Sequence, residues 1–445
     1  MTKTTRRDLL RSAAIAGAGA SSLALLNQKG ALASGALSRA SSLGRAQDGN
    51  VELTWAINAE SGTEIDLVQS VVDKFVELNP NYKVSVLNYD PETYDQKLLT
   101  DISAGTLPDL FVSADVFTKP FFDSGLTADL KPLAAASGFD LSTFDEKFLA
   151  LAEYEDQVGF LPRAADVVVT YYNKKMFDAA GVAYPTDAWT YDDMLAAAEK
   201  LTIKASDGTT TQYGVSAAYD WWAQWVPMVV AEGGEILNED NTEAIFNSEA
   251  GYRAWNVTFK GLQNGWFCPP SVQDTMGGVW GPFGAAKAAM TFTVRALTPT
   301  YRAQLQDDWD VQVVPAGSVK RMTGMGTMGY AMSSKTKDPA ATWKLLEYTY
   351  SDGMKFFMES YLVVPPISTF YDDPAWKDLP GPPYNNDVFV NAINDAMMPP
   401  PLPFYSTGPF NKAMKDGIDA VILGQMTTEQ AVDNMAKEAT ASLQE

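Results

Sequence analysis

The chain contains no histidine and only one cysteine, Cys268, among its 445 residues. Without histidine there is no Ser-His-Asp or Cys-His nucleophile pair, no His-based zinc site and no imidazole general base. A single thiol cannot form an internal disulfide, and we expect Cys268 to be a buried small apolar group. Carboxylate, lysine or tyrosine chemistry stays open, so these absences narrow the possible enzymes without excluding them all.

Basic residues are scarce relative to acidic ones. The chain has 33 Lys and Arg against 55 Asp and Glu, a formal net charge of −22. That charge repels nucleic-acid phosphates and anionic membrane surfaces, so we expect no nucleic-acid partner. With 46% hydrophobic and 20% charged residues, the composition is typical of a globular protein. The length is sufficient for two or three domains, each with its own hydrophobic core.

The first residues have the pattern of an export signal. Residues 1–33 combine a basic start, an uncharged run over 12–26 and a cleavage motif, Ala31-Leu32-Ala33. Residues 5–11 resemble a twin-arginine signal, and a general secretory signal is the alternative. Residues 34–47 are predicted to be a disordered leader. No cysteine stands directly after the apolar run and no later stretch has the length of a membrane span, so we expect a soluble periplasmic protein without a lipid anchor.

From residue 51 the hydrophobic pattern alternates between strands and helices, which predicts an α/β fold. Ser61 with Glu64, or Thr63 with Asp66, fits the start of the first helix as a capping box. The strand at 109–113 completes a βαβαβ unit with a mostly parallel sheet, in which ligands bind beyond the carboxyl ends of the strands. The other expected strands are 51–57, 83–88, 167–172, 288–293, 311–314 and 330–333, and the expected helices are 91–104, one capped by Thr190 and Asp193, 219–232, 339–350 and 428–443.

Several motifs together resemble extracellular solute-binding protein family 1, the maltose-binding type. The most specific are Tyr-Tyr-Asn-Lys-Lys-Met-Phe at 171–177, Ala-Gly-Val at 180–182 and Trp-Thr-Tyr-Asp-Asp-Met-Leu at 189–195. The resemblance continues over nearly all of the chain after the signal, through 231–237, 246–248, 284–290 and 339–343. It implies a two-lobed periplasmic-binding-protein fold (type II), a ligand cleft between the lobes, no cofactor, and a monomer that delivers its ligand to the permease subunits of an ABC transporter.

The same resemblance implies how the chain is divided between the lobes. The N-terminal lobe would contain residues 48–161 and 322–362, and the C-terminal lobe residues 162–321 and 363–445. Pro162 and residues 314–317 are the expected crossing points.

Aromatic residues are the first candidates for holding a sugar, because sugars present flat apolar faces as well as a rim of hydroxyls. Tyr219, Trp221, Trp222 and Trp225 lie in one expected helix, where Trp221 and Trp225 would share a face at i, i+4 spacing. We expect at least one of the four to line the cleft. Trp280 is a further candidate, in a glycine-rich loop. The tryptophans in plain strand or helix patterns are predicted to be structural: Trp55, Trp189, Trp255, Trp309 and Trp343.

Polar candidates follow the first and third expected strands. Asn58, Glu60 and Ser61 occupy the loop after the first strand, and Asp115 ends the third. Carboxylates at these places could accept hydrogen bonds from pairs of sugar hydroxyls. The alternative for each is a solvated loop, and for Ser61 a helix cap is favoured.

Two more candidates come from the expected edges of the cleft. Arg295 follows the strand that ends at Thr293. If it faces the cleft it could bind a carboxylate, a phosphate or a hydroxyl pair, and the alternative is an ordinary surface ion pair. Tyr361 lies near a lobe crossing.

Three functions follow from these patterns. The leading one is a non-catalytic receptor for a mono- or oligosaccharide. The second keeps the receptor but changes its ligand to a sugar acid, a glycerol phosphate ester, a polyamine or another small solute. The third is an exported carbohydrate-active enzyme with paired carboxylates. No pattern indicates a metal or a cofactor.

Overall fold

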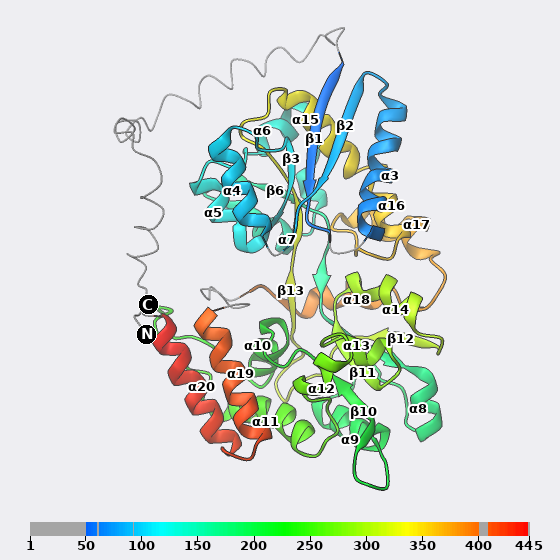
Figure 1. Ribbon diagram of the computed structural model, residues 1–445, viewed down its shortest axis with the longest axis vertical. Helices are drawn as coiled ribbons and strands as arrows, with labels where there is room; N and C mark the ends of the chain where they lie inside the picture. Colours follow the sequence, from blue (N-terminus) through cyan, green and yellow to red (C-terminus); the bar gives the residue numbers. More distant parts are fainter. Residues whose placement is uncertain (1–49, 60–61, 92, 400–407, 444–445) are drawn as a thin grey trace. The chain divides into compact units, whose positions relative to one another are not determined.

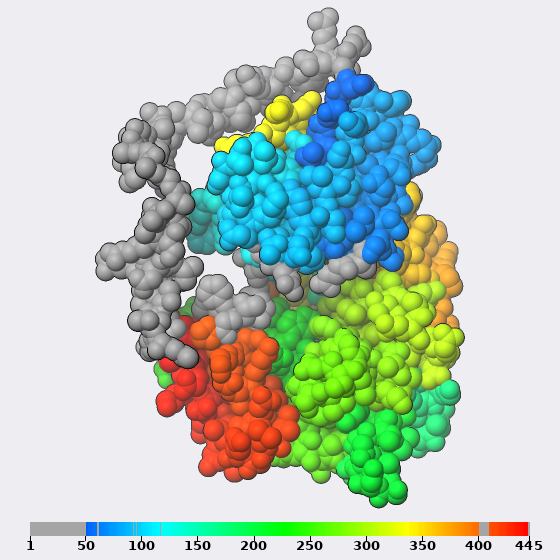
Figure 2. Space-filling model, viewed as in Figure 1, coloured from blue at the N-terminus to red at the C-terminus, as the bar shows by residue number. Residues whose placement is uncertain are grey.

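The computed structural model describes residues 50–59, 62–91, 93–399 and 408–443. The predicted signal peptide and leader lie outside the described residues, and so do Glu60 and Ser61. The described chain forms two α/β lobes, each built around a five-stranded sheet (Figure 1). Figure 2 shows that the first strands and helices of the described chain lie in one lobe and the C-terminal helices in the other.

The sheet of the first lobe has the order β2-β1-β3-β14-β6. Strands β1 (Val51–Ile57), β2 (Tyr82–Asn88) and β3 (Leu110–Ala114) are parallel, which confirms the predicted βαβαβ unit. Strand β14 (Met328–Met332) runs antiparallel between β3 and β6 (Phe160–Pro162). A segment more than 200 residues away in sequence therefore completes this sheet.

Helices cover this sheet because each places an apolar stripe against it. Helix α3 (Gly62–Leu78) buries Val68, Val71, Val72 and Phe75, at the i, i+3, i+4 and i+7 spacing of one helix face. Trp55 of β1 and Tyr330 of β14 meet edge to face, with 4.7 Å between ring centroids. The remaining elements of this lobe are α4 (Tyr94–Ala104), η1 (Asp115–Phe117), α5 (Thr118–Asp123), α6 (Lys131–Ser137), η2 (Leu141–Thr143), α7 (Glu146–Leu151), β4 (Glu153–Tyr154), β5 (Gln157–Val158), α15 (Pro339–Thr349) and α16 (Met354–Glu359). After α16 the chain forms η4 (Ser368–Asp372) and α17 (Pro374–Lys377).

The sheet of the second lobe has the order β12-β8-β11-β10-β9 and is mixed. Strands β10 (Thr210–Ser216) and β11 (Ala288–Thr293) are parallel, whereas β8 (Val169–Asn173) is antiparallel to β11 and to β12 (Trp309–Gln312). Helix α9 begins with the predicted capping box between Thr190 and Asp193. The other elements are β9 (Ile203–Lys204), α8 (Lys174–Ala180), α9 (Tyr191–Leu201), α10 (Trp222–Ala231), α11 (Glu249–Gln263), α12 (Pro270–Thr275), α13 (Gly281–Gly284), η3 (Arg295–Leu297), α14 (Thr298–Gln304), α18 (Asp387–Ala392), η5 (Ile393–Asp395), α19 (Gly408–Ile422) and α20 (Thr428–Leu443).

A small third sheet lies where the chain passes between the lobes. Its central strand is β13 (Thr323–Gly326), which pairs antiparallel with β7 (Asp166–Val167) and parallel with β15 (Ala396–Met397). The predicted strand 167–172 is therefore two strands, because Val168 leaves the ladder and its N–H donates to the carbonyl of Gly324 at 3.1 Å. We call β7, β13 and β15 the hinge sheet.

Two expectations about helix starts need correction. Helix α3 begins at Gly62, so of its two expected caps Thr63 is wrong, since it lies inside the helix, and the other, Ser61, lies outside the described residues. Helix α10 begins at Trp222, after a turn in which the N–H of Trp221 donates to the carbonyl of Ala218 at 2.9 Å. Trp221 is the N-cap residue with an extended backbone, so Trp221 and Trp225 do not share a helix face.

Candidate functional site

The candidate site is built from loops at the carboxyl ends of parallel strands in both lobes, where α/β proteins bind ligands. In the first lobe these loops follow β1 and β3 and meet the start of the hinge sheet. In the second lobe Trp221 and Gln224 follow β10, Phe292 lies near the end of β11, and Trp280 lies in the loop between α12 and α13. We call the first group the polar half-site (Asn58, Glu64, Asp115, Arg163 and Asp166) and the second group the aromatic half-site (Trp221, Gln224, Trp280 and Phe292).

Arg163 is the central cation of the polar half-site. It follows β6 and is 7% exposed. Its Nη1 lies 2.9 Å from Oε1 of Glu64 and donates to the hydroxyl of Tyr330 at 3.2 Å. A charged hydrogen bond with this little solvent contact is stronger than a surface ion pair. Arg163 therefore fixes the first turn of α3 to the segment that leaves the first lobe.

Asp115 and Asn58 occupy the loops after β3 and β1. Both side chains are half-buried. The Asp115 Oδ2 accepts a hydrogen bond from the N–H of Thr327 at 3.2 Å, so this carboxylate connects β3 to the junction between β13 and β14. Asn88 holds the loop beside Asn58, because its side-chain amide bonds both the N–H and the carbonyl of Ala59. Asn58 and Asp115 thus stand on fixed backbone.

Asp166 has an unusual electrostatic environment for a half-buried carboxyl. Burial raises its pKa to about 6, the charges of Asp115 and Glu64 raise it as well, and Arg163 opposes them. The folded state therefore holds the proton of Asp166 over a pH range in which the unfolded chain has released it. Such a group lowers the free energy of unfolding as the pH rises.

We expect this contribution to appear in the pH dependence of stability. Between pH 3.8, the ordinary pKa of the group, and about 6, the free energy of unfolding should fall by on the order of 2 kcal/mol more in the wild type than in Asp166→Asn. Urea unfolding of both proteins across this range measures the difference. Parallel curves for the two proteins would contradict the assignment.

The aromatic half-site is centred on two indoles. Trp221 and Trp280 are both half-buried, and their rings meet edge to face at 6.1 Å with an interplanar angle of 85°. Gln224, in the first turn of α10, donates from Nε2 to the carbonyl of Phe292 at 2.7 Å. Trp280 Nε1 points at the same carbonyl oxygen from 3.5 Å. One carbonyl near the end of β11 therefore contacts both Trp280 and the first turn of α10, which carries Trp221.

Three aromatic candidates from the sequence are packed inside the second lobe. Tyr219 donates its hydroxyl hydrogen to the carbonyl of Cys268 at 2.9 Å and stacks on Phe267. Trp222 is 5% exposed. Trp225 is 3% exposed and stacks on Trp255. These burials give the three side chains packing roles in place of the expected position in the cleft, because each ring faces the lobe interior.

Arg295 is wholly buried, so it makes neither the surface ion pair nor the exposed anion site considered from the sequence. Its guanidinium lies 4.3 Å from the ring centroid of Trp376 and 5.0 Å from that of Phe389, and Nη1 donates to Oδ1 of Asn386 at 2.7 Å. Nε and Nη2 have no hydrogen-bond partner among the described residues. Burial lowers the pKa of Arg295 to about 10, so it is still a cation at neutral pH.

Tyr361 is also buried, next to this guanidinium. It is 8% exposed, and its hydroxyl donates to the carbonyl of Pro380 at 2.6 Å. The guanidinium carbon of Arg302 lies 3.9 Å from the Tyr361 ring centroid. These contacts hold the segment after α16 against the second lobe, which is a packing role.

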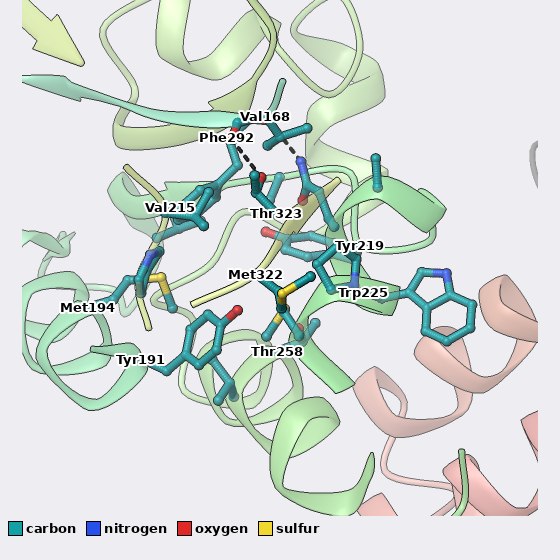
Figure 3. Close-up of a pocket in the computed structure, with 18 of the residues that line it drawn as sticks. Val168, Tyr191, Met194, Val215, Tyr219, Trp225, Thr258, Phe292, Met322 and Thr323 are labelled. Atoms are coloured by element: carbon teal, nitrogen blue, oxygen red, sulfur yellow. Dashed lines mark hydrogen bonds between the residues drawn. The ribbon is translucent and has the colours of Figure 1, made fainter. Parts of the chain in front are cut away.

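A cavity lies inside the second lobe beneath α10 (Figure 3). Its volume is about 50 Å³, and its walls include Tyr191, Met194, Tyr219, Met322 and Thr323. That volume holds only a few waters, whereas a pocket for a drug-sized ligand has roughly 300 Å³ or more. The cavity is therefore too small to hold a sugar, although Gln224 and Phe292 of the aromatic half-site are among the residues that line it.

Two features of the described residues bear on other functions. No group of three or more Cys, Asp or Glu side chains within those residues is arranged to hold a metal ion. Among the described helices, none combines the length and the apolar character needed to cross a bilayer. Cys268 is buried, as expected, and burial raises the pKa of its thiol to about 12.

Residues 60–356 match the family described as bacterial extracellular solute-binding protein. The match covers more than half of the chain, so this chain belongs to that family. A putative binding protein of Brucella abortus is 27% identical over 318 residues, which are 68% of this chain and 73% of the relative. A maltotriose-binding protein of Pyrococcus abyssi is 24% identical over 71% of this chain and 67% of its own length.

Solved structures show the same fold. An ABC substrate-binding protein from Listeria monocytogenes in complex with cycloalternan superimposes with a TM-score of 0.76 at 24% identity, over 89% of this chain and 99% of that one. The two-lobed periplasmic-binding-protein fold expected from the sequence is therefore confirmed. The matched relatives and structures are binding proteins, which favours a function without catalysis.

The structure adds four residues that the sequence did not single out. Gln224 and Phe292 complete the aromatic half-site, and Arg163 and Asp166 complete the polar one. The sequence holds a usable signal for three of them, because Phe292 lies near the end of a strand and Arg163 and Asp166 closely follow the expected crossing at Pro162. Gln224 carried no such signal, since its role depends on where α10 begins.

Proposed function

We propose that the protein is an exported receptor that binds a neutral mono- or oligosaccharide between its lobes and delivers it to the permease subunits of an ABC transporter. The observation that carries the proposal is the half-buried Trp221–Trp280 pair at the carboxyl ends of β10 and β11. Family membership supports the receptor role. The ligands named for the relatives, maltotriose and cycloalternan, support the sugar.

The chemistry of the two half-sites suits a sugar. An indole offers a flat apolar surface to the C–H face of a pyranose ring, while carboxylate and amide oxygens accept hydrogen bonds from its hydroxyls. Asn58, Asp115 and Asp166 supply such oxygens in the first lobe. Binding would then shift the equilibrium toward a conformation in which both half-sites contact the same solute.

The charges argue for a neutral solute over an anionic one. The polar half-site has three carboxyl groups against one arginine, and that arginine already pairs with Glu64. Arg295, the one cation expected to bind an acid group, is covered by Trp376 and Phe389. A sugar acid or glycerol phosphate ester would therefore meet repulsion at the first lobe and no accessible guanidinium from Arg295 at the second.

The remaining parts of the proposal come from the sequence. Residues 1–33 would direct export by the twin-arginine route, which places the mature chain in the periplasm as a soluble monomer. The lobes would comprise residues 48–161 with 322–362 and residues 162–321 with 363–445. Neither a cofactor nor catalysis forms part of this function.

A thermal-shift panel tests the proposal. At a concentration of 100 Kd a solute stabilises the folded protein by about 2.7 kcal/mol, which raises the Tm by several degrees. We expect neutral oligosaccharides to produce such a shift and sugar acids, glycerol phosphate esters and polyamines to produce none. A shift with an anionic or cationic class alone would support the second receptor, product formation from a glycoside would support an enzyme, and no shift with any sugar would contradict the proposal.

A further inference from the structure

The hinge strand β13 and helix α10 touch backbone to backbone. A Cβ atom added to Gly324 would lie 2.5 Å from the Cα of Ala223 and 2.6 Å from its carbonyl oxygen. Distances this short are not tolerated, so only glycine allows the strand to approach the first turn of α10 this closely. Figure 1 shows β13 running between the lobes, with α10 beside its lower end.

The segment before β13 is fixed to the other end of the same helix. The N–H groups of Val319 and Lys320 donate to the carbonyl of Ala231 at 3.1 and 3.2 Å. The backbone N–H and the hydroxyl of Ser318 donate to the carboxylate of Glu232 at 3.1 and 2.6 Å. Residues 318–324 are therefore attached to α10 at both of its ends.

Helix α10 also positions the aromatic half-site. Trp221 is its N-cap residue, and Gln224 in its first turn bonds the carbonyl of Phe292. Any displacement of the first turn would change the position of Trp221 relative to Trp280, because Trp280 stands on a separate loop. The aromatic pair is thus sensitive to the position of β13.

The first turn of α10 is also the part of the helix best able to move. Pro227 has no N–H, so the helical hydrogen bond to the carbonyl of Ala223 cannot form. The cavity beneath the helix gives the turn space, and the residues that line it include the methionines Met194, Met228 and Met322. Figure 3 shows Met194 and Met322 beside the cavity. Unbranched methionine side chains adapt readily to small shifts in packing.

We propose that Gly324 is a positioning residue that couples the hinge sheet to the aromatic half-site. Bending of β13 on solute binding moves the first turn of α10 with it and brings Trp221 into its solute-bound position against Trp280. The inference rests on the proposed function, since it assumes that the pair contacts the solute. The coupling itself exists in the solute-free protein as well.

Gly324→Ala tests the coupling, with Gly326→Ala as the matched control in the same strand. At Gly326 an added Cβ would meet only Oδ2 of Asp115 at 3.2 Å, the end of a side chain that can shift. We expect Gly324→Ala to weaken solute binding by about tenfold or more. Gly326→Ala is a control for the aromatic pair and not for the affinity, because its added Cβ meets Asp115 of the polar half-site. The solute used is the neutral oligosaccharide that stabilises the wild type most.

A second readout needs no solute. Two indoles in contact give a coupled circular-dichroism signal. For the wild type and for each glycine variant, this signal is isolated by subtracting the spectrum of the same protein with the additional substitution Trp221→Phe. We expect Gly324→Ala to alter this difference spectrum and Gly326→Ala to preserve it. If Gly324→Ala lacks a cooperative thermal transition, Ala223→Ser replaces it, because that change adds one atom to the α10 side of the same contact.

The outcomes separate the two proposals. A folded Gly324→Ala protein with the wild-type pair signal and affinity overturns the coupling, and so does an equal change of the pair signal in both glycine variants. A wild type that binds no sugar contradicts the proposed function, while the altered pair signal of Gly324→Ala would still support the coupling.

Discussion

Trp221→Ala is expected to weaken solute binding by about 30- to 1,000-fold while leaving the thermal stability nearly unchanged. The indole is half-buried at the N-cap of α10 and meets the Trp280 ring at 6.1 Å. Aromatic anchors in such a position typically contribute about 2 to 4 kcal/mol to binding. Its loss removes the apolar surface on which a sugar ring would stack, whereas few core contacts depend on it. Calorimetric titration with the stabilising sugar measures the effect.

Trp266→Ala is the matched control for this prediction. Trp266 is also a half-buried indole of the second lobe, but it lies just after the end of α11, where the amine of Lys260 stands 5.9 Å from its ring centroid. We expect its affinity to stay within about threefold of the wild type, below the 1 kcal/mol that marks a contributing contact. Equal losses in the two variants would show that the Trp221 effect is not local to the aromatic half-site.

Trp225→Ala is expected to destabilise the second lobe by about 3 to 5 kcal/mol. The indole is 3% exposed and stacks on Trp255 and on Phe410 of α19, so it joins three helices. Figure 3 shows it pointing from α10 toward the C-terminal helices and away from the centre of the cavity. Truncation would leave a large void at this junction. Urea unfolding followed by circular dichroism measures the loss.

The volume-conserving variant separates packing from binding at this position. Trp225→Phe keeps most of the stacked surface, so we expect a loss below about 2 kcal/mol and an unchanged affinity for the solute. A stable Trp225→Ala protein that had lost its affinity would instead assign Trp225 to the solute site.

Elements with a strong local pattern could be predicted from the sequence. Strand β11 and helix α20 have the predicted bounds, and the capping box of α9 was evident from Thr190 and Asp193. The tryptophans expected to be structural are indeed buried, with Trp55 and Trp309 at 0% exposure and Trp255 at 2%. Each of these features depends on hydrophobic periodicity or on residues three or four positions apart.

The site could be predicted only in part, because its geometry depends on contacts distant in sequence. The turn from Ala218 to Trp221 delays the start of α10, which moves Trp221 off the face shared by Trp225. Arg295 faces Trp376 and Phe389, which lie more than 80 residues later in the chain, and no local pattern indicates this aromatic cover. Sequence alone places such residues near a strand end but does not determine which way their side chains point.

The central claim is that a neutral sugar binds at the aromatic half-site. The most direct test is a tryptophan-fluorescence titration of two proteins with the sugar that stabilises the wild type most. One protein is the wild type, and the other is a double variant that carries both Trp221→Phe and Trp280→Phe. We predict a saturable change in the wild type, and in the double variant the loss of most of that change together with weaker binding. An equal change at unchanged affinity in the double variant, or no saturable change in the wild type, would contradict the claim.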